Sequence, residues 1–390
     1  MKSTSSMLRV IHSCGPLMPE TGGLAHYIVE LCSNLSEDGV DVRMLALDMG
    51  DRFSEAQEVN VPLTQVPVKC ALGMTPVWTP HYEFELKCMV SNFEPHLIHD
   101  HGLWITTKMA AQRVVQQSSL PLVVSTHGML TPWALRHRFG RKKLAWWLYQ
   151  KKVLLAASAF HASSSSEAEG IRNLGFDKPI AVIPHAIQLP DLQTISTSRS
   201  SSQRTLLFLS RIHPVKGLLN LIAAVESASL VNWQVIIAGP DENGYRTEVE
   251  RAVENSNLTK QITFHEPVYG QAKWDLIRQA DLFILPSFTE NFGIAVAEAL
   301  ACGIPVITTT GTPWEDLAKY RCGWWVEGDV HSLTRALLEA HSLSPEALKD
   351  MGDNGRQLIE TKYSWPRVVD QMTWFYRWIL GEAERPNFVL

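Results

Sequence analysis

The segment Leu282-Phe-Ile-Leu-Pro-Ser-Phe-Thr-Glu-Asn-Phe-Gly-Ile-Ala-Val-Ala-Glu298 contains a short apolar run, a polar loop and the start of an apolar helix. The run 282–285 is typical of a buried strand, and we expect the helix to begin at Gly293. Free backbone N–H groups and the positive end of the helix dipole suit such a loop for binding a diphosphate. Glu290 lies in the loop, and Glu298 lies a little over one helical turn beyond Gly293. Carboxylates at this spacing can accept hydrogen bonds from hydroxyl groups on either side of a pyrophosphate.

Around this segment, the chain alternates short apolar runs with amphipathic stretches, a pattern typical of α/β proteins with parallel sheets. The stretch 191–204 interrupts the pattern, because it is rich in serine and threonine and has little to bury. The 390 residues, 45% of them hydrophobic, are enough for two buried cores. We therefore predict an α/β fold with two facing Rossmann-like domains, 1–190 and 205–364, joined by a linker at 191–204. Ligands are expected in a cleft between the domains, beyond the carboxyl ends of the strands.

Two further loops carry groups that suit a phosphate. The loop Leu209-Ser-Arg-Ile-His-Pro-Val-Lys-Gly217 is expected to join a strand to a helix and contains the cations Arg211 and Lys216. A forked guanidinium and a compact ammonium together suit a diphosphate leaving group, although the same charges in isolation would merely be solvated. Near the N-terminus, Gly22 and Gly23 precede a predicted helix, where a phosphate or a sugar can approach the backbone closely.

The sequence disfavours several other classes of protein. It contains neither G-x-G-x-x-G after its first strand nor a P-loop motif, which disfavours dinucleotide-dependent oxidoreductases and P-loop kinases. It contains no Asp-x-Asp pair, so we expect no metal ion to clamp the diphosphate and no other cofactor. The six cysteines are widely spaced, which is typical of buried thiols and not of a disulfide framework or a zinc site. The net charge of −5 disfavours nucleic acid as a partner.

The charge is unevenly distributed, because no acidic residue lies between Asp100 and Glu167, whereas nine lysines and arginines do. Within this stretch, residues 132–152 combine cations with tryptophan and tyrosine. Two interpretations stay open: a surface that rests on an anionic bilayer or receives a lipid-linked acceptor, and a helix that buries Trp146 and Leu148 under a solvated basic face. No apolar run is long enough to span a membrane, and the N-terminus lacks the apolar core of a signal peptide. We expect a cytoplasmic protein, with peripheral attachment to the inner face of the membrane as one option.

The motifs above occur in the same order in the family 4 glycosyltransferases of the GT-B fold, which this chain resembles nearly from end to end. The sequences His127-Gly-Met-Leu-Thr-Pro-Trp133 and Gly311-Thr-Pro-Trp314 are similar to those of bacterial enzymes of cell-surface polysaccharide assembly. The resemblance implies transfer, with retention of configuration, of a hexose-type sugar from a nucleotide diphosphate sugar. The acceptor would be a hydroxyl group of a glycan or of a lipid-linked glycan. It also implies that the final segment, 365–390, contains a helix that packs back on the N-terminal domain.

The resemblance assigns roles to individual residues. It implies that Arg211 and Lys216 hold the leaving diphosphate, that Glu290 contacts the donor sugar, and that His127 lies near the transferred sugar. These four are the candidate catalytic residues. The expected donor-binding residues, which include Glu298 on the ribose, are Gly22, Gly23, Asn291, Phe292, Gly293 and Glu298. Candidates on the acceptor side are His101 and Trp133.

The chain departs from the family pattern at two places. Pro184-His185-Ala186 stands where the family often has Asn-Gly after Ile-Pro, and Phe264-His265-Glu266 stands where many members have glycine after the phenylalanine. The second position lies in the loop that binds the nucleotide base, so a side chain replaces backbone there. Two alternative functions remain compatible with the fold: a nucleotide-sugar epimerase, and a catalytically silent protein that binds sugar nucleotides.

Overall fold

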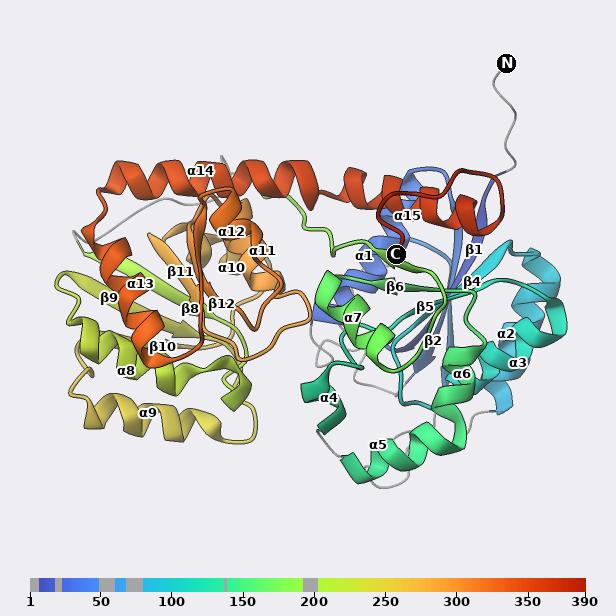
Figure 1. Cartoon of the computed structure of the whole chain (residues 1–390), viewed down its shortest axis with the longest axis horizontal. Helices are drawn as coiled ribbons and strands as arrows, with labels where there is room; N and C mark the ends of the chain where they lie inside the picture. Colours follow the sequence, from blue (N-terminus) through green and yellow to red (C-terminus); the bar gives the residue numbers. More distant parts are fainter. Residues whose placement is uncertain (1–6, 18–22, 49–59, 68–79, 137–138, 192–202) are drawn as a thin grey trace, which may run out of the picture. The chain divides into compact units, whose positions relative to one another are not determined.

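A computed structural model describes residues 7–17, 23–48, 60–67, 80–136, 139–191 and 203–390 (Figure 1). The chain divides into two compact units. The first comprises Met1–Ala186 together with Trp365–Leu390, and the second comprises Ile187–Ser364. Most of the stretch expected to be a linker, and Gly22 of the first loop, lie outside the described residues.

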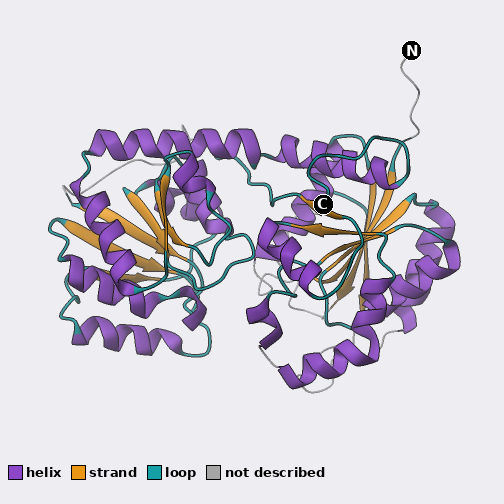
Figure 2. Cartoon of the chain, in the orientation of Figure 1, coloured by secondary structure: helices purple, strands orange, loops and turns teal. Residues whose placement is uncertain are grey.

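The first unit is built on a parallel sheet of seven strands in the order β3-β2-β1-β4-β5-β6-β7. Figure 2 shows the strands in orange and the helices in purple. The inner strands of this sheet are short apolar runs, since helices cover both faces of a parallel sheet and leave no polar side. The strands are β1 (Arg9–Pro16), β2 (Asp41–Asp48), β3 (Leu63–Pro67), β4 (Leu97–His101), β5 (Leu122–Ser125), β6 (Ala159–Ala162) and β7 (Ile180–Val182).

Helices flank this sheet, and the last helix of the chain belongs with them. Its helices are α1 (Gly23–Glu37), α2 (Pro80–Phe93), α3 (Lys108–Ser118), α4 (Pro132–Arg136), α5 (Phe139–Ala145), α6 (Lys151–Leu155), α7 (Ser165–Asn173) and α15 (Trp365–Ile379). Apolar side chains of α15, such as Val368 and Phe375, share one core with α1 and β1. The C-terminal helix is therefore an integral part of the first unit.

The second unit contains a parallel six-stranded sheet in the order β10-β9-β8-β11-β12-β13. Its strands are β8 (Arg204–Leu209), β9 (Trp233–Ala238), β10 (Ile262–His265), β11 (Leu282–Leu285), β12 (Val306–Thr309) and β13 (Gly323–Val326). Its helices are η4 (Pro214–Lys216, 3₁₀), α8 (Leu218–Ala228), α9 (Tyr245–Asn255), α10 (Gly270–Arg278), α11 (Ile294–Ala301), α12 (Asp316–Lys319), α13 (Val330–Ser342) and α14 (Pro345–Lys362). Most of the buried apolar residues described in this unit form one core.

Both sheets reverse their strand order at one point, as Rossmann-like sheets do. The reversal lies between β1 and β4 in the first unit and between β8 and β11 in the second. The loops after neighbouring strands diverge at such a point and leave room for a ligand. Most of the predicted site residues lie at the end of these strands or in the segments that follow them, whereas His127 and Trp133 follow β5.

A π-helical segment, η3 (Trp146–Gln150), lies between α5 and α6. The wider turn coincides with two hydrogen bonds to the backbone of Trp104. The Tyr149 hydroxyl donates to the Trp104 carbonyl at 2.8 Å, and the Trp104 N–H donates to Gln150 at 2.8 Å. Two consecutive side chains thus reach the same residue, which the sequence pattern did not indicate.

Candidate functional site

Two loops of the second unit, which follow β8 and β11, are in direct contact. Gly217 has a φ of +70°, and a Cβ atom there would lie 2.1 Å from the carbonyl oxygen of Pro286. The backbone N–H of Phe288 donates to the Val215 carbonyl at 2.8 Å. Only glycine permits both this conformation and this close approach. The contact fixes the position of Lys216 relative to the loop that carries Glu290.

Lys216 and Glu290 form an ion pair across the reversal point of the sheet. The ammonium of Lys216 donates to a carboxylate oxygen of Glu290, and the Ser287 hydroxyl donates to the same oxygen at 2.7 Å. The exposed fractions of the two side chains are 9% and 14%. The backbone N–H of Glu290 donates to the Gly311 carbonyl, so the loop after β12 also supports the pair. A cation and a carboxylate thus share a site that water reaches poorly.

The loop after β11 ends where α11 begins. Gly293 adopts a φ of +82° directly before the helix, so the first N–H groups of α11 are at the loop end. The Phe292 side chain is buried and packs against Trp314, whose indole N–H donates to the Phe292 carbonyl. Phe292 therefore holds the loop in place by its side chain, and its carbonyl is engaged by Trp314.

Glu298 lies on α11 with a partner that the sequence did not indicate. Lys273, on α10, donates to its carboxylate at 2.6 Å, and the exposed fractions of the two side chains are 24% and 13%. Because the sequence neighbours of Glu298 are apolar, we expected its carboxylate to have a binding role. No local pattern pointed to Lys273, because it is 25 residues away and depends on the packing of α10 against α11.

Arg211 does not share a partner with Lys216. Its guanidinium pairs with Glu242, which follows β9, and both side chains are well exposed. Nearby, Arg246 of α9 lies over the Phe264 ring of β10 and pairs with Glu266, which follows β10, at 3.0 Å. His265, the last residue of β10, is exposed. The two residues that depart from the family pattern thus have side chains at the surface.

In the first unit, the loop after β5 holds His127 in an unusual backbone conformation. His127 has a φ of +49°, and the following Gly128 has a φ of +72°. Glu167 accepts hydrogen bonds from Thr126 and from the N–H of Gly128, at 2.5 and 2.6 Å. Buried Glu167 also accepts from Ser163 and so ties the loop to α7. It is the acid that ends the acid-free stretch of the sequence, and it supports the His127 loop.

His127 belongs to a group of five imidazoles, called here the histidine cluster. His12, His99, His101 and His161 are buried, and His127 is partly buried. The Ser125 hydroxyl lies 2.6 Å from a ring nitrogen of each of His99 and His161. The other nitrogen of His99 is 2.6 Å from the Tyr376 hydroxyl, so α15 contributes to the cluster. Burial lowers the pKa of every member, and that of His12 to about 3. The cluster is therefore neutral at physiological pH.

Of the remaining candidates of the first unit that the structure describes, only His101 lines a cavity of about 200 Å³, which lies beside β1 and β4. Gly23 is the first residue of α1 and is exposed. His101 is buried and lines the cavity. The other lining residues are mainly apolar: Cys14, Gly15, Pro16, Leu17, Leu24, Ala25, Ile28, Gly102, Leu103, Ile105 and Met129. Trp133, on α4, does not line it and is 45% exposed.

His185, the other departure from the family pattern, belongs to a stack of aromatic rings. Its ring lies 3.9 Å from that of Tyr27, which in turn stacks on Trp365 of α15 at 5.8 Å. Burial lowers the pKa of His185 to about 3. An asparagine at this position would not provide the same stacking, so the departure has a structural reason.

The segment from α5 to α6 presents large apolar side chains together with cations. Leu144, Trp147, Leu148 and Leu155 are 57–83% exposed. Exposed cations lie beside them: Arg141, Lys143, Lys151 and Lys152. One interpretation of this segment was a helix that buries Trp146 and Leu148. Trp146 packs against Trp104 and Phe176, but Leu148 is exposed, so the prediction is wrong for Leu148. Among the described residues, no helix is long and apolar enough to cross a bilayer.

Comparison with known proteins agrees with this architecture. Residues 22–186 match the glycosyl transferase 4-like domain, and residues 193–358 match the glycosyl transferases group 1 family. The chain is 26% identical to a D-inositol 3-phosphate glycosyltransferase of Arthrobacter sp., over 90% of this chain and 88% of that protein. It is 22% identical to a GDP-mannose:cellobiosyl-diphosphopolyprenol alpha-mannosyltransferase of Xanthomonas campestris, over 96% and 98%. A sucrose-phosphate synthase structure from Thermosynechococcus elongatus superposes with a TM-score of 0.78, at 19% identity, over 96% and 100%.

Proposed function

Because the chain belongs to the family 4 glycosyltransferases and has the GT-B fold, we propose that it transfers a hexose from a nucleotide diphosphate sugar to a hydroxyl group. The acceptor in this proposal is a glycan or a lipid-linked glycan, and the product belongs to a surface polysaccharide. The Xanthomonas relative, whose name specifies a nucleotide sugar and a polyprenol-linked acceptor, supports this choice.

The pairing of Lys216 with Glu290 is the observation that carries the proposal. A bound donor would place its diphosphate against the Lys216 ammonium and the free N–H groups at the start of α11. Glu290 would then accept hydrogen bonds from the hydroxyl groups of the sugar. Glu298 and Lys273 would lie on the ribose side, and Arg211 would leave Glu242 for the diphosphate. Lys216 and Arg211 are thus each paired with a carboxylate of the same unit.

Retention of configuration follows in this proposal from attack on the face that the diphosphate leaves. The bond between C1 of the sugar and the phosphate oxygen breaks, and its electron pair stays on the diphosphate. The acceptor oxygen bonds to C1, and its proton passes to the departing phosphate oxygen. Lys216 and the helix N-terminus stabilise the negative charge that develops, so we expect the reaction to require no metal ion.

The cavity beside His101 is the proposed place for the acceptor side of the reaction, with Trp133 as an outer contact. Its apolar lining suits a non-sugar part of an acceptor, as in a lipid-linked glycan. His127, whose loop Glu167 supports, is proposed to contact the transferred sugar. Gly22 and Gly23 are proposed to approach the diphosphate.

A membrane is the second proposed partner. The exposed leucines and Trp147 lie within the short α5–α6 segment, and the four exposed cations of the same segment suit anionic lipid headgroups. This arrangement supports peripheral attachment to the cytoplasmic face of a membrane, where a lipid-linked acceptor would be available.

One experiment separates the proposal from its alternatives. Thermal shift with UDP, GDP, dTDP and ADP identifies the nucleotide, and the matching sugar nucleotides are then supplied with and without a polyprenol-linked glycan. A transferase forms a glycosylated acceptor together with free nucleoside diphosphate. Isomerised donor without acceptor would show an epimerase, and stabilisation without any turnover would show a silent binding protein.

A further inference from the structure

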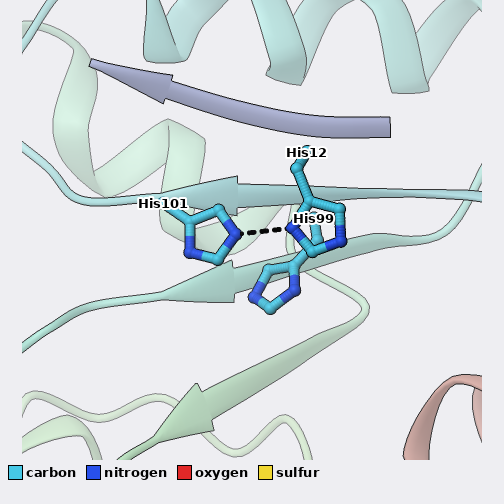
Figure 3. Close-up of side chains that lie close together, drawn as sticks. All are labelled: His12, His99 and His101. Carbon is cyan, nitrogen blue, oxygen red and sulfur yellow. Dashed lines mark hydrogen bonds between the residues drawn. The ribbon is translucent and has the colours of Figure 1, made fainter. Parts of the chain in front are cut away.

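Three imidazoles of the histidine cluster form a continuous hydrogen-bonded row that joins two strands and a loop. Nε2 of His127 lies 3.1 Å from Nδ1 of His101, and Nε2 of His101 lies 2.9 Å from Nδ1 of His12. Figure 3 shows His101 and His12 joined by this second contact, with His99 to one side. The row begins on the loop after β5, passes through β4 and ends on β1.

The hydrogen bonds of the row couple the protonation of the three rings. A neutral imidazole has one N–H and one acceptor nitrogen, so two neighbours that bond cannot both donate or both accept. The three tautomers are therefore coupled. Either all three protons are on Nδ1, so that His12 donates to His101 and His101 donates to His127, or all three are on Nε2, so that His127 donates to His101 and His101 donates to His12.

The inner end of the row distinguishes these two states. Nε2 of His12 is buried and has no hydrogen-bond partner among the residues that the structure describes. With the protons on Nε2, this atom would be a buried N–H without an acceptor, which is rare in proteins. With the protons on Nδ1, it is an unprotonated nitrogen without a donor, which is the less costly of the two arrangements. The geometry favours the Nδ1–H state.

We propose that His12 and His101 are positioning residues that hold His127 in its Nδ1–H tautomer, so that His127 presents a neutral hydrogen-bond donor to the substrate. Because Nε2 of His127 is hydrogen-bonded to His101, Nδ1 is the nitrogen that can bind a ligand. In this state His127 donates to an oxygen of the sugar or of the acceptor and does not remove a proton from it. The inference rests on the proposed role of His127 near the transferred sugar.

His12, His99 and His101 also have the composition of a metal site, since one nitrogen of each lies within 4.8 Å of the others. Their orientation does not suit an ion. The rings of His99 and His101 stack at 4.1 Å, so their in-plane lone pairs do not converge on one point. Both nitrogens of His99 are already engaged, with Tyr376 and Ser125. The hydrogen-bonded row accounts for the cluster better than a metal ion does.

The ring nitrogens of ¹⁵N-histidine-labelled protein, observed by NMR, test the proposal directly, because protonated and unprotonated nitrogens differ strongly in chemical shift. In the full-length wild-type chain, we expect His127 to be protonated at Nδ1 only. In His101→Phe, which keeps the ring and removes both nitrogens, we expect the His127 proton to move largely to Nε2. In His101→Gln, whose amide can accept from His12 and donate to His127, we expect the wild-type tautomer to return. His161→Phe, outside the row but equally buried, should leave His127 unchanged.

Turnover provides the second readout. We expect His101→Phe to lower kcat roughly tenfold, the loss of about one hydrogen bond to the reacting complex, and His101→Gln to restore most of it.

Wild-type His127 protonated at Nε2, or a His127 tautomer that does not change in His101→Phe, would overturn the proposal. The wild-type spectrum decides even where a variant does not fold. Shifts of the His12 and His101 signals on addition of one equivalent of Zn²⁺ would also overturn it. If His127→Ala turns over normally while the tautomers are as expected, the proposed role of His127 fails and the row itself stands.

Discussion

The Lys216 ammonium donates to the Glu290 carboxylate, although 74 residues separate the two in the sequence. The contact exists because β8 and β11 are neighbours in the sheet, and because Gly217 lets the first loop approach the carbonyl of Pro286. Lys216 and Glu290 are thus held together in the second unit. In the proposed mechanism, a bound diphosphate would take Lys216 as its partner and leave Glu290 for the sugar hydroxyl groups.

The first prediction concerns this cation. Lys216→Ala should lower kcat by about 100- to 1,000-fold, because it removes a donor from the charge that develops on the leaving diphosphate. Steady-state turnover of the matching sugar nucleotide measures the effect. Lys349→Ala, which breaks an exposed ion pair on α14, is the matched control and should keep the wild-type rate. A rate within about threefold of wild type for Lys216→Ala would remove this residue from the mechanism.

The second prediction separates binding from chemistry. Glu298→Gln should raise KM for the donor about tenfold with little change in kcat, because a ribose contact stabilises the ground state and the transition state alike. Glu360→Gln, which affects an exposed pair with Arg356 on α14, should change neither constant. A fall in kcat with unchanged KM would place Glu298 at the reacting atoms and contradict the assignment.

The third prediction concerns acid stability of the first unit. The pKa of His12 and that of His185 are lowered to about 3 by burial, whereas an unfolded histidine titrates near 6.5. Between these values the unfolded chain binds more protons, so the free energy of unfolding falls as the pH drops from about 6.5 toward 3. Each such histidine contributes a slope of up to about 1.4 kcal/mol per pH unit.

Calorimetry at a series of pH values should therefore show the Tm of the first unit falling steeply below about pH 6.5. His185→Phe keeps a ring on Tyr27 and removes the titrating group, so it should lower the slope. A Tm that stays level from pH 7 to pH 5 would contradict burial of neutral histidines in the folded state.

The fourth prediction tests the membrane surface. Replacement of Trp147 and Leu148 by glutamine should weaken binding to vesicles that contain anionic lipid by about tenfold or more, since both side chains are exposed and apolar. Co-sedimentation at low salt measures the partition. Leu338→Gln, an exposed leucine of α13, is the control. Wild-type protein that remains in the supernatant would contradict the proposed attachment to a membrane.

Those features of the molecule that local sequence patterns determine could be predicted from the sequence. The fold class followed from the alternation of apolar runs and helices, and comparison with known structures confirms the GT-B fold. The position of Gly293 at the start of α11 followed from the residues around it. Lys216 and Glu290 were singled out in separate loops by charge and spacing, and the sheet brings them into contact.

What the sequence did not indicate depends on contacts between distant elements. Lys273 pairs with Glu298 only because α10 packs beside α11. His12 and His161 read as ordinary residues of apolar strands, and they form a cluster only once β1, β4, β5 and β6 lie in order. The repeat of His99 and His101 on one face of a strand was the one local signal of that cluster. Glu167 was visible as the end of an acid-free stretch, but its hydrogen bonds to the His127 loop were not.

The configuration of the first sugar released from the donor tests the central claim most directly. The enzyme is mixed with the matching α-linked nucleotide sugar in EDTA-containing buffer, with water or a simple alcohol as acceptor, and the anomeric proton of the product is followed by NMR. The account predicts that the α product forms first, that EDTA does not slow its formation, and that Lys216→Ala forms it far more slowly. A β product, or a rate that does not depend on Lys216, would contradict the account.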